Sequence, residues 1–247
     1  VKTRIVPLNN DIWYMDVAQE SYDSLDLMEE SSAQDILAGV GRAVGSVNPE
    51  LGEIFRYMQD NELYDIQSGE DGQDRMDNNY TVGLPSYGDA FIFINRNHTF
   101  TDYQSLIHEF GHFSSYYYNS VPELFQGYSV DVCEVQSQGL EMLVNQYAGD
   151  MFGEGAEAFE FETVTDMLYV IIMSCMLQEF EEAVYMDPDM SLEDMNRTFK
   201  EIQDSYHGWY FDVYDEGVCY DWVDVSHLFY SPLYYLSLIH ISEPTRP

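Results

Sequence analysis

The sequence predicts a mainly α-helical protein with a small β-sheet, and two observations carry this prediction. Apolar residues recur at helical spacing over most of the chain, whereas only 80–84 and 90–95 have the composition of strands. The 247 residues are enough to bury a core, and a hydrophobic fraction of 45% argues against wholesale disorder.

Local signals place each element. Helices are expected over 32–47, 49–63, 103–118, 130–148, 157–186 and 195–206. Pro49 stands in a first helical turn, where the missing N–H of proline is tolerated. A polar, glycine-containing loop at 68–79 precedes the two strands, and a turn with proline and glycine at 85–89 joins them. Asp102 is the expected N-cap of the third helix, and Ser191 begins a capping-box-like sequence before the last one.

Composition excludes several classes of function. Nine basic residues against 45 acidic ones give a net charge of −36, which repels nucleic acid and anionic membrane surfaces. The three cysteines are far apart and form no C-x-x-C pair, so neither a disulfide scaffold nor a cysteine zinc ribbon is expected. The longest apolar stretch, 167–177, is shorter than the roughly 20 residues that span a bilayer.

The two ends of the chain bear on its location and its boundaries. No secretory signal is visible, so we expect a cytoplasmic protein, although a chain that starts at Val1 leaves secretion open. The last residues contain LSLIHISEPTR, which looks like a translated sequencing adapter. We therefore expect 236–247 to be a non-native tail and assign no role to His240.

A metal-binding pattern lies in the third predicted helix. His108-Glu-Phe-Gly-His112 contains H-E-x-x-H, and histidines four residues apart lie about 40° apart around a helix, on one face. One zinc ion can bridge two such imidazoles, and Glu109 can take a proton from a water molecule that the zinc activates. The alternative is a helix whose histidines pack or cap without metal.

A catalytic zinc site needs a third protein ligand from another element. Glu134 lies 22 residues after His112, a distance that fits a helix end, a loop and an antiparallel return helix. The alternative to a metal ligand is that Glu134 is one of the many solvent-exposed acidic residues of this chain. Glu141 on the same helix is either an outer partner that orients a zinc-bound histidine or a surface acid.

The run 90–95 is either an edge strand that pairs with an extended peptide or an ordinary buried strand.

Three segments together resemble one protein family. They are HEFGH followed by EVQSQGLE, the preceding GLPSYGDAFIFIN, and the late aromatic segment YDWVDVSHLFYSPLYY. In this order they resemble the thimet oligopeptidase / oligoendopeptidase F family of zinc metallopeptidases, over about residues 60–235. The resemblance implies a zincin-like (gluzincin) fold and a partial metallopeptidase catalytic domain over 1–235.

The resemblance also implies the site residues. His108, His112 and Glu134 would bind one zinc ion, and Glu109 would be the general base. It implies a zinc-dependent endopeptidase (a hydrolase, and a metalloprotease) whose partners are short peptides rather than nucleic acid or membranes. Two alternatives stay open, a metallocarboxypeptidase of a related helical zinc fold and an inactive fragment that binds zinc or peptide.

In the same family, a histidine and a tyrosine in the late aromatic segment stabilise the oxyanion. His227 matches that histidine. Tyr234 is the first choice for the tyrosine and Tyr230 the second, while a further family tyrosine would fall at or near Leu238 in the suspect tail. Peptide specificity, the cleavage position and the oligomeric state do not follow from these residues.

Overall fold

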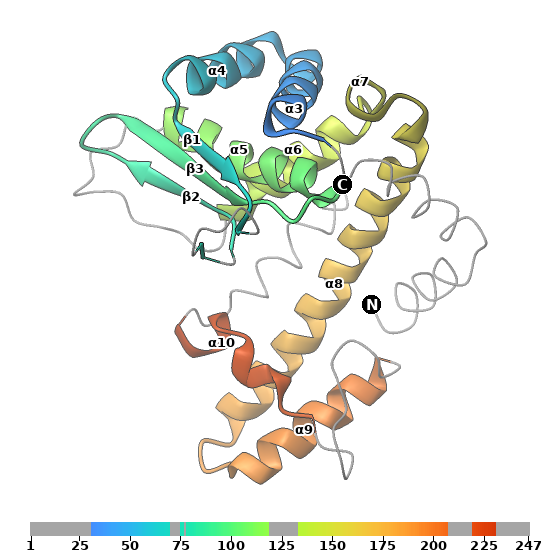
Figure 1. Ribbon diagram of the computed structural model, residues 1–247. Helices are drawn as coiled ribbons and strands as arrows, with labels where there is room; N and C mark the ends of the chain where they lie inside the picture. The colour runs from blue at the N-terminus through green and yellow to red at the C-terminus, as the bar shows by residue number, and fades with distance from the viewer. Residues whose placement is uncertain (1–30, 70–74, 77, 119–132, 207–218, 231–247) are drawn as a thin grey trace, which may run out of the picture. The chain divides into compact units, whose positions relative to one another are not determined.

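The computed structural model describes residues 31–69, 75–76, 78–118, 133–206 and 219–230. These residues belong to two compact units, which we call the first unit (described residues up to 164) and the second unit (described residues from 165 onward). Helices dominate and a small sheet accompanies them (Figure 1), so the predicted mainly α-helical class is confirmed.

The first unit contains a three-stranded sheet. Its strands are β1 (Tyr64–Gln67), β2 (Tyr80–Leu84) and β3 (Asp89–Asn95), in the order β1-β3-β2, with β1 parallel and β2 antiparallel to β3. Of the two alternatives for 90–95, the edge strand is therefore wrong and the ordinary buried strand is confirmed. Both sides of β3 are paired, and its alternate residues Ala90, Ile92 and Ile94 are buried in the core. Among the described strands, β2 forms one of the two edges.

All six predicted helices are present close to their predicted residues, and two short helices were not predicted. They are α3 (Ala33–Val47), α4 (Pro49–Asp60), α5 (Thr101–Tyr118), α6 (Cys133–Asn145), α7 (Gly149–Phe152), α8 (Ala156–Met186), α9 (Leu192–Ser205) and α10 (His227–Tyr230). Ser32 and Asp35 form a capping box that starts α3, and Asn48 caps α4 directly before Pro49. The Ser191 hydroxyl accepts from the Asp194 N–H at 3.1 Å and starts α9 as predicted.

The start of α5 differs from the prediction. The helix begins at Thr101, so Asp102 lies inside it instead of capping it. The buried Asp102 carboxylate accepts hydrogen bonds from Arg96 Nε at 3.2 Å and from the Asn97 N–H at 3.0 Å. This ion pair ties the segment after β3 to the first turn of α5, and it fixes where the helix starts relative to the sheet.

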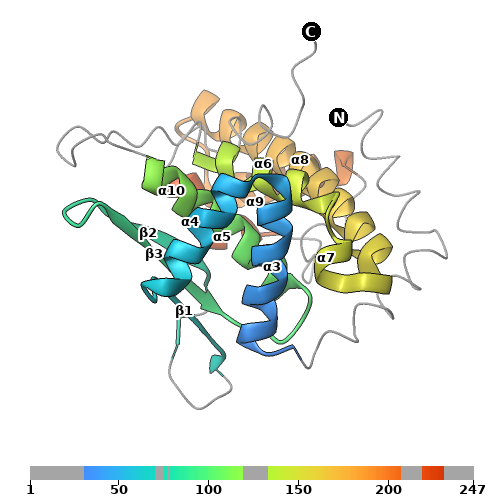
Figure 2. The ribbon, with the colours of Figure 1, turned by 90° about the horizontal axis from the view of Figure 1, so that it is seen from above.

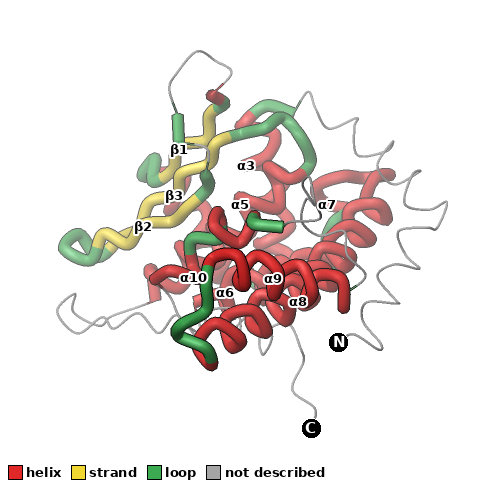
Figure 3. The backbone as a smooth tube through the Cα atoms, turned by 90° about the horizontal axis from the view of Figure 1, so that it is seen from below, coloured by secondary structure: helices red, strands yellow, loops and turns green. Residues whose placement is uncertain are grey.

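Helix α5 lies at the centre of the first unit. It contacts the sheet, α3, α4 and α6, as two further views show (Figure 2, Figure 3). Leu106, Phe110 and Phe113 on α5 are fully buried, and the rings of Phe110 and Phe55 meet edge to face with centroids 4.9 Å apart. Aromatic pairs of this geometry add to the free energy of folding beyond the area they bury. The central helix is therefore held on several sides.

The second unit has a core of its own. The later part of α8, which continues from the first unit, packs its Leu177 and Phe180 against Phe199 of α9 and against Trp222. Trp222 lies in a 3₁₀ turn, Asp221–Asp224, and its Nε1–H donates to Asn196 Oδ1 at 2.9 Å. None of the described helices, α8 included, combines the length and the apolar character needed to cross a membrane.

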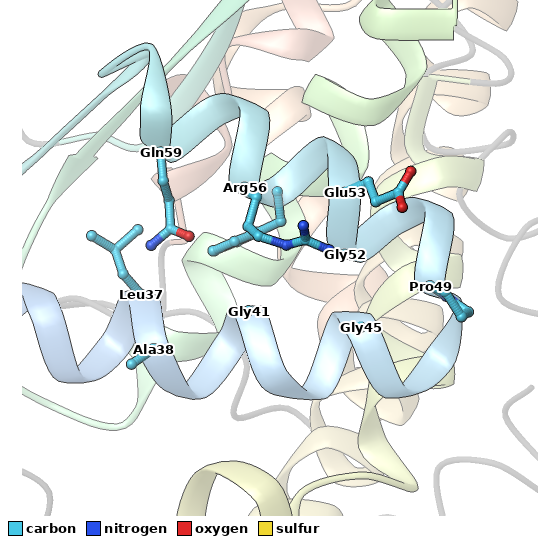
Figure 4. A pocket seen from close by; sticks show the side chains of 10 residues that line it. Leu37, Ala38, Gly41, Gly45, Pro49, Gly52, Glu53, Arg56 and Gln59 are labelled. Carbon is cyan, nitrogen blue, oxygen red and sulfur yellow. The ribbon is translucent and has the colours of Figure 1, made fainter.

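A cavity of about 420 Å³ opens between α3 and α4 (Figure 4). Glycines 41, 45 and 52 line it together with Arg56, and a Cβ atom on Gly52 would lie 2.9 Å from the Gly45 Cα. The two helices thus nearly touch at one end. The cavity shares no residue with the histidine motif on α5.

Candidate metal centre

Three donor atoms from α5 and α6 form a nearly equilateral triangle. Glu134 Oε2 lies 3.2 Å from His108 Nε2 and 3.4 Å from His112 Nε2, and the two Nε2 atoms are 3.3 Å apart. Tetrahedral ligands about 2.0–2.1 Å from a zinc ion lie about 3.3 Å from one another. The donor set and its spacing therefore fit one zinc ion, with a fourth position left for a water molecule or substrate.

One glycine allows the two helices to approach this closely. A Cβ atom on Gly111 would lie 2.5 Å from the Ser137 Cα and 2.7 Å from the Gln136 carbonyl oxygen. These are backbone atoms of α6, which cannot turn aside as a side chain can. Glycine between the two histidines thus lets α6 lie directly on α5, and this contact brings Glu134 opposite His108 and His112.

Hydrogen bonds behind the triangle orient its members. His108 Nδ1 lies 2.6 Å from Glu141 Oε1, and because a carboxylate only accepts, Nδ1 carries the proton and Nε2 is turned toward the triangle. The Ser137 hydroxyl donates to Glu134 Oε2 at 2.6 Å. Glu141 is therefore the outer partner that the sequence offered as one alternative. The other alternative, a surface acid, is wrong, since its side chain is only 15% exposed.

The charged groups of the cluster shift the pKa values of His108 and Glu134. Burial disfavours the charged form of His108, but hydrogen bonds to Glu134 and Glu141 outweigh burial and raise its pKa to about 10. Burial also works against the Glu134 carboxylate, yet hydrogen bonds from His108, His112 and Ser137 hold its pKa well below the usual range. Both shifts favour a protonated His108 imidazole next to ionised carboxylates when no metal is bound.

The buried Glu109 carboxylate lies beside the cluster. Burial raises its pKa, and a hydrogen bond from Thr81 together with the two neighbouring histidines partly offsets that rise. Thr81 Oγ1 lies 2.7 Å from Glu109 Oε2. A carboxylate whose pKa is raised is a better proton acceptor than an ordinary surface glutamate.

Zinc binding is expected to release protons. His108 must lose its proton to become a ligand, so with a pKa of about 10 it should give up about one proton per zinc ion at about pH 8. Calorimetric titration with zinc in buffers of different ionisation enthalpy measures this number. Glu141→Gln removes one of the two carboxylates that raise the His108 pKa, so it should lower the proton count. An unchanged count would contradict the assignment.

The raised pKa of His108 also determines how the stability of the metal-free protein depends on pH. The folded-state pKa of His108, about 10, lies above its reference value of 6.5. Its contribution to stability is therefore fully present below about pH 6.5 and is lost as the pH rises through the folded pKa.

The solved structures that this chain resembles are described as peptidases. PZ peptidase A, solved with an inhibitor, matches 86% of this chain with a TM-score of 0.73 and 25% sequence identity. A protein described as oligoendopeptidase F matches 98% of the chain with a TM-score of 0.76, also at 25% identity. The chain is similar to the oligoendopeptidase F peptidases. The predicted zincin-like fold is confirmed.

Further comparisons show how far this similarity extends. An oligoendopeptidase F from Bacillus anthracis matches 96% of the chain with a TM-score of 0.66 at 20% identity, and that likeness supports the fold alone. The chain covers 38%, 45% and 44% of these three proteins, so it spans less than half the length of each. No protein-family model matches the sequence, and no curated protein does.

The structure brings together four of the six predicted site residues. His108, His112, Glu134 and Glu109 gather in the first unit. His227 is the first residue of α10 in the second unit, so its role stays a prediction. Tyr234 lies outside the described residues, as do 1–30 and the suspected tail. Tyr230 ends α10.

Two residues of the site were missed by sequence reasoning. Ser137 lies within the EVQSQGLE segment that carries the resemblance, so its position there was an available signal. Thr81 gave none, because a threonine in a strand is ordinary and its contact with α5 spans 28 residues of sequence.

Proposed function

We propose that the chain carries the catalytic region of a zinc-dependent endopeptidase that hydrolyses oligopeptides. The observation that supports this most is the triangle of His108, His112 and Glu134 donor atoms with the buried Glu109 carboxylate beside it. The relationship to oligoendopeptidase F and PZ peptidase supports a peptide as the substrate.

The residues of the cluster have distinct roles in this proposal. His108, His112 and Glu134 would hold one zinc ion, which polarises a carbonyl group and lowers the pKa of a water molecule to about 7. Glu141 and Ser137 fix the orientation of two of these ligands through hydrogen bonds of 2.6 Å each.

Glu109 is the proposed general base. Its carboxylate takes a proton from the attacking water and later passes that proton to the leaving amine, so that one side chain serves as base and then as acid. Burial raises the pKa of Glu109, which makes its carboxylate a better proton acceptor than an exposed one.

Strand β2, not β3, is the strand we propose for substrate contact. An extended peptide can add to a sheet edge through main-chain hydrogen bonds, and β2 offers such an edge among the described strands. The Thr81 side chain of β2 reaches Glu109, so a peptide along this edge would lie next to the base.

The remaining assignments rest on the family resemblance. We propose that His227 donates a hydrogen bond to the oxyanion that develops on the carbonyl group, with Tyr234 as its partner. A donor aimed at the transition-state charge contributes more to the rate than one that binds the ground state equally well.

Metal removal tests the proposal. Treatment with a chelator should abolish the cleavage of oligopeptides blocked at both ends, and one equivalent of zinc should restore it, because the water loses its activation without the ion. Cleavage is followed with an internally quenched peptide, and zinc by elemental analysis.

The same assay separates the alternatives. Cleavage confined to peptides with a free C-terminus would point to a carboxypeptidase. A stable, zinc-loaded protein that cleaves no peptide would point to a zinc-binding fragment and would overturn the proposal.

A further inference from the structure

We propose that Thr81 is a positioning residue for the catalytic base: its hydroxyl holds one carboxylate oxygen of Glu109, so that the other oxygen takes the proton from water. This inference rests on the proposed peptidase function. Thr81 Oγ1 lies 2.7 Å from Glu109 Oε2 and 2.8 Å from the Glu109 backbone carbonyl oxygen. The hydroxyl thus contacts the base at both its side chain and its backbone.

The strand holds Thr81 rigidly in place. Thr81 is opposite Ile92 in the antiparallel ladder, and Ile92 is fully buried. Because side chains alternate along a strand, Thr81 and Gly83 face α5 while Tyr80 and Val82 are exposed on the other side. A Cβ atom on Gly83 would lie 2.6 Å from the Tyr116 ring, so β2 lies very close to α5 at this point.

The contact limits the freedom of the Glu109 side chain. A glutamate has three rotatable side-chain bonds, and a hydrogen bond to a fixed, β-branched threonine selects one arrangement of them. The Thr81 hydroxyl has one proton, which Glu109 Oε2 shares with the backbone carbonyl oxygen of the same residue. Oε2 is therefore partly occupied as an acceptor, and the second carboxylate oxygen is the one left for the proton from water. Correct placement of a catalytic group before the reaction lowers the barrier by removing that ordering from the activation step.

Three variants test the role. Thr81→Val keeps the shape but loses the hydroxyl, and should lower kcat about 10- to 100-fold with KM and zinc content unchanged. Thr81→Ser restores the hydroxyl and should regain most of the wild-type kcat. Thr163→Val is the matched control, because Thr163 Oγ1 donates to the Phe159 carbonyl at 2.9 Å on α8, outside the cluster. It should leave kcat unchanged.

A spectroscopic readout makes the test independent of turnover. In protein labelled with carbon-13 at the glutamate carboxyl carbon, the Glu109 signal is the one absent from Glu109→Gln. We expect Thr81→Val to shift this signal and Thr81→Ser to leave it near its wild-type position.

The outcomes separate this inference from the proposed function. Cleavage that persists in Glu109→Gln would overturn both. Cleavage lost in Glu109→Gln but at the wild-type rate in Thr81→Val would overturn only the positioning role. A zinc-loaded, folded Thr81→Ser protein as slow as Thr81→Val would do the same, because the hydroxyl would then not be the cause.

Discussion

Glu109→Gln is expected to bind zinc as the wild type does and to cleave oligopeptides about 10²- to 10⁴-fold more slowly, the range that general-base catalysis contributes. Glutamine has nearly the shape of glutamate and its carbonyl oxygen can still accept from Thr81, so folding should not change. The amide cannot take a proton from water. Steady-state kinetics with an internally quenched peptide and zinc analysis of the same sample measure both quantities.

Two further variants serve as controls for this experiment. Glu134→Ala removes a vertex of the donor triangle and should lose both zinc and cleavage. Its fall in zinc affinity should exceed about 100-fold, the upper end for losing an outer hydrogen-bond partner. Glu53→Ala, at an exposed acid on α4, should change neither quantity. Wild-type cleavage by zinc-loaded Glu109→Gln would rule out Glu109 as the base.

Gly111→Ala is expected to destabilise the fold and weaken zinc binding together. The added methyl group would meet the α6 backbone at 2.5 Å from the Ser137 Cα, so the two helices must move apart. Overpacking of this kind costs about 1–3 kcal/mol. For a chain of this size, that free energy lowers Tm by about 2–12 °C. Zinc affinity should fall as well, because Glu134 moves with α6.

Gly139→Ala is the matched control for that variant. Gly139 lies in the middle of α6, and nothing stands within 4 Å of the position that its Cβ atom would take. Alanine at an unobstructed helical position is expected to stabilise the protein by about 0.5–1 kcal/mol. Thermal unfolding followed by circular dichroism compares the two. A Gly111→Ala protein as stable and as zinc-loaded as Gly139→Ala would show that close helix contact is not what assembles the cluster.

The helices and the two histidines of the candidate metal centre were predictable because their signals are local. Helical spacing of apolar residues and the caps at Ser32, Asn48 and Ser191 give α3, α4 and α9 close to their observed bounds. The four-residue spacing of His108 and His112 fixes their common face without reference to the rest of the fold.

The sheet was harder to predict because its order depends on contacts between distant segments. β1 has four residues, of which only Ile66 is buried, so its sequence shows no strand period. Its parallel pairing with β3 is what makes 90–95 the central strand and excludes the alternative of an edge strand. A short sequence cannot reveal which of its two sides another strand will occupy.

Asp102 and Thr81 show the same limit for side chains. Aspartate is a residue type that often caps helices, yet Asp102 forms a buried ion pair with Arg96 instead. Thr81 contacts Glu109 only because β2 packs on α5. Secondary-structure propensity depends on a residue and its own segment of the chain. The Asp102 ion pair and the Thr81 contact with Glu109 depend on another segment that packs against it.

The division of the chain into two compact units affects how preparations of this protein should be standardised. All three donor atoms belong to the first unit, whereas the proposed oxyanion donor His227 belongs to the second. Damage confined to the second unit would leave all three donor atoms in place, so if they bind zinc as proposed, elemental analysis would overstate the number of working molecules. Titration with a tightly bound transition-state mimic would count competent molecules directly.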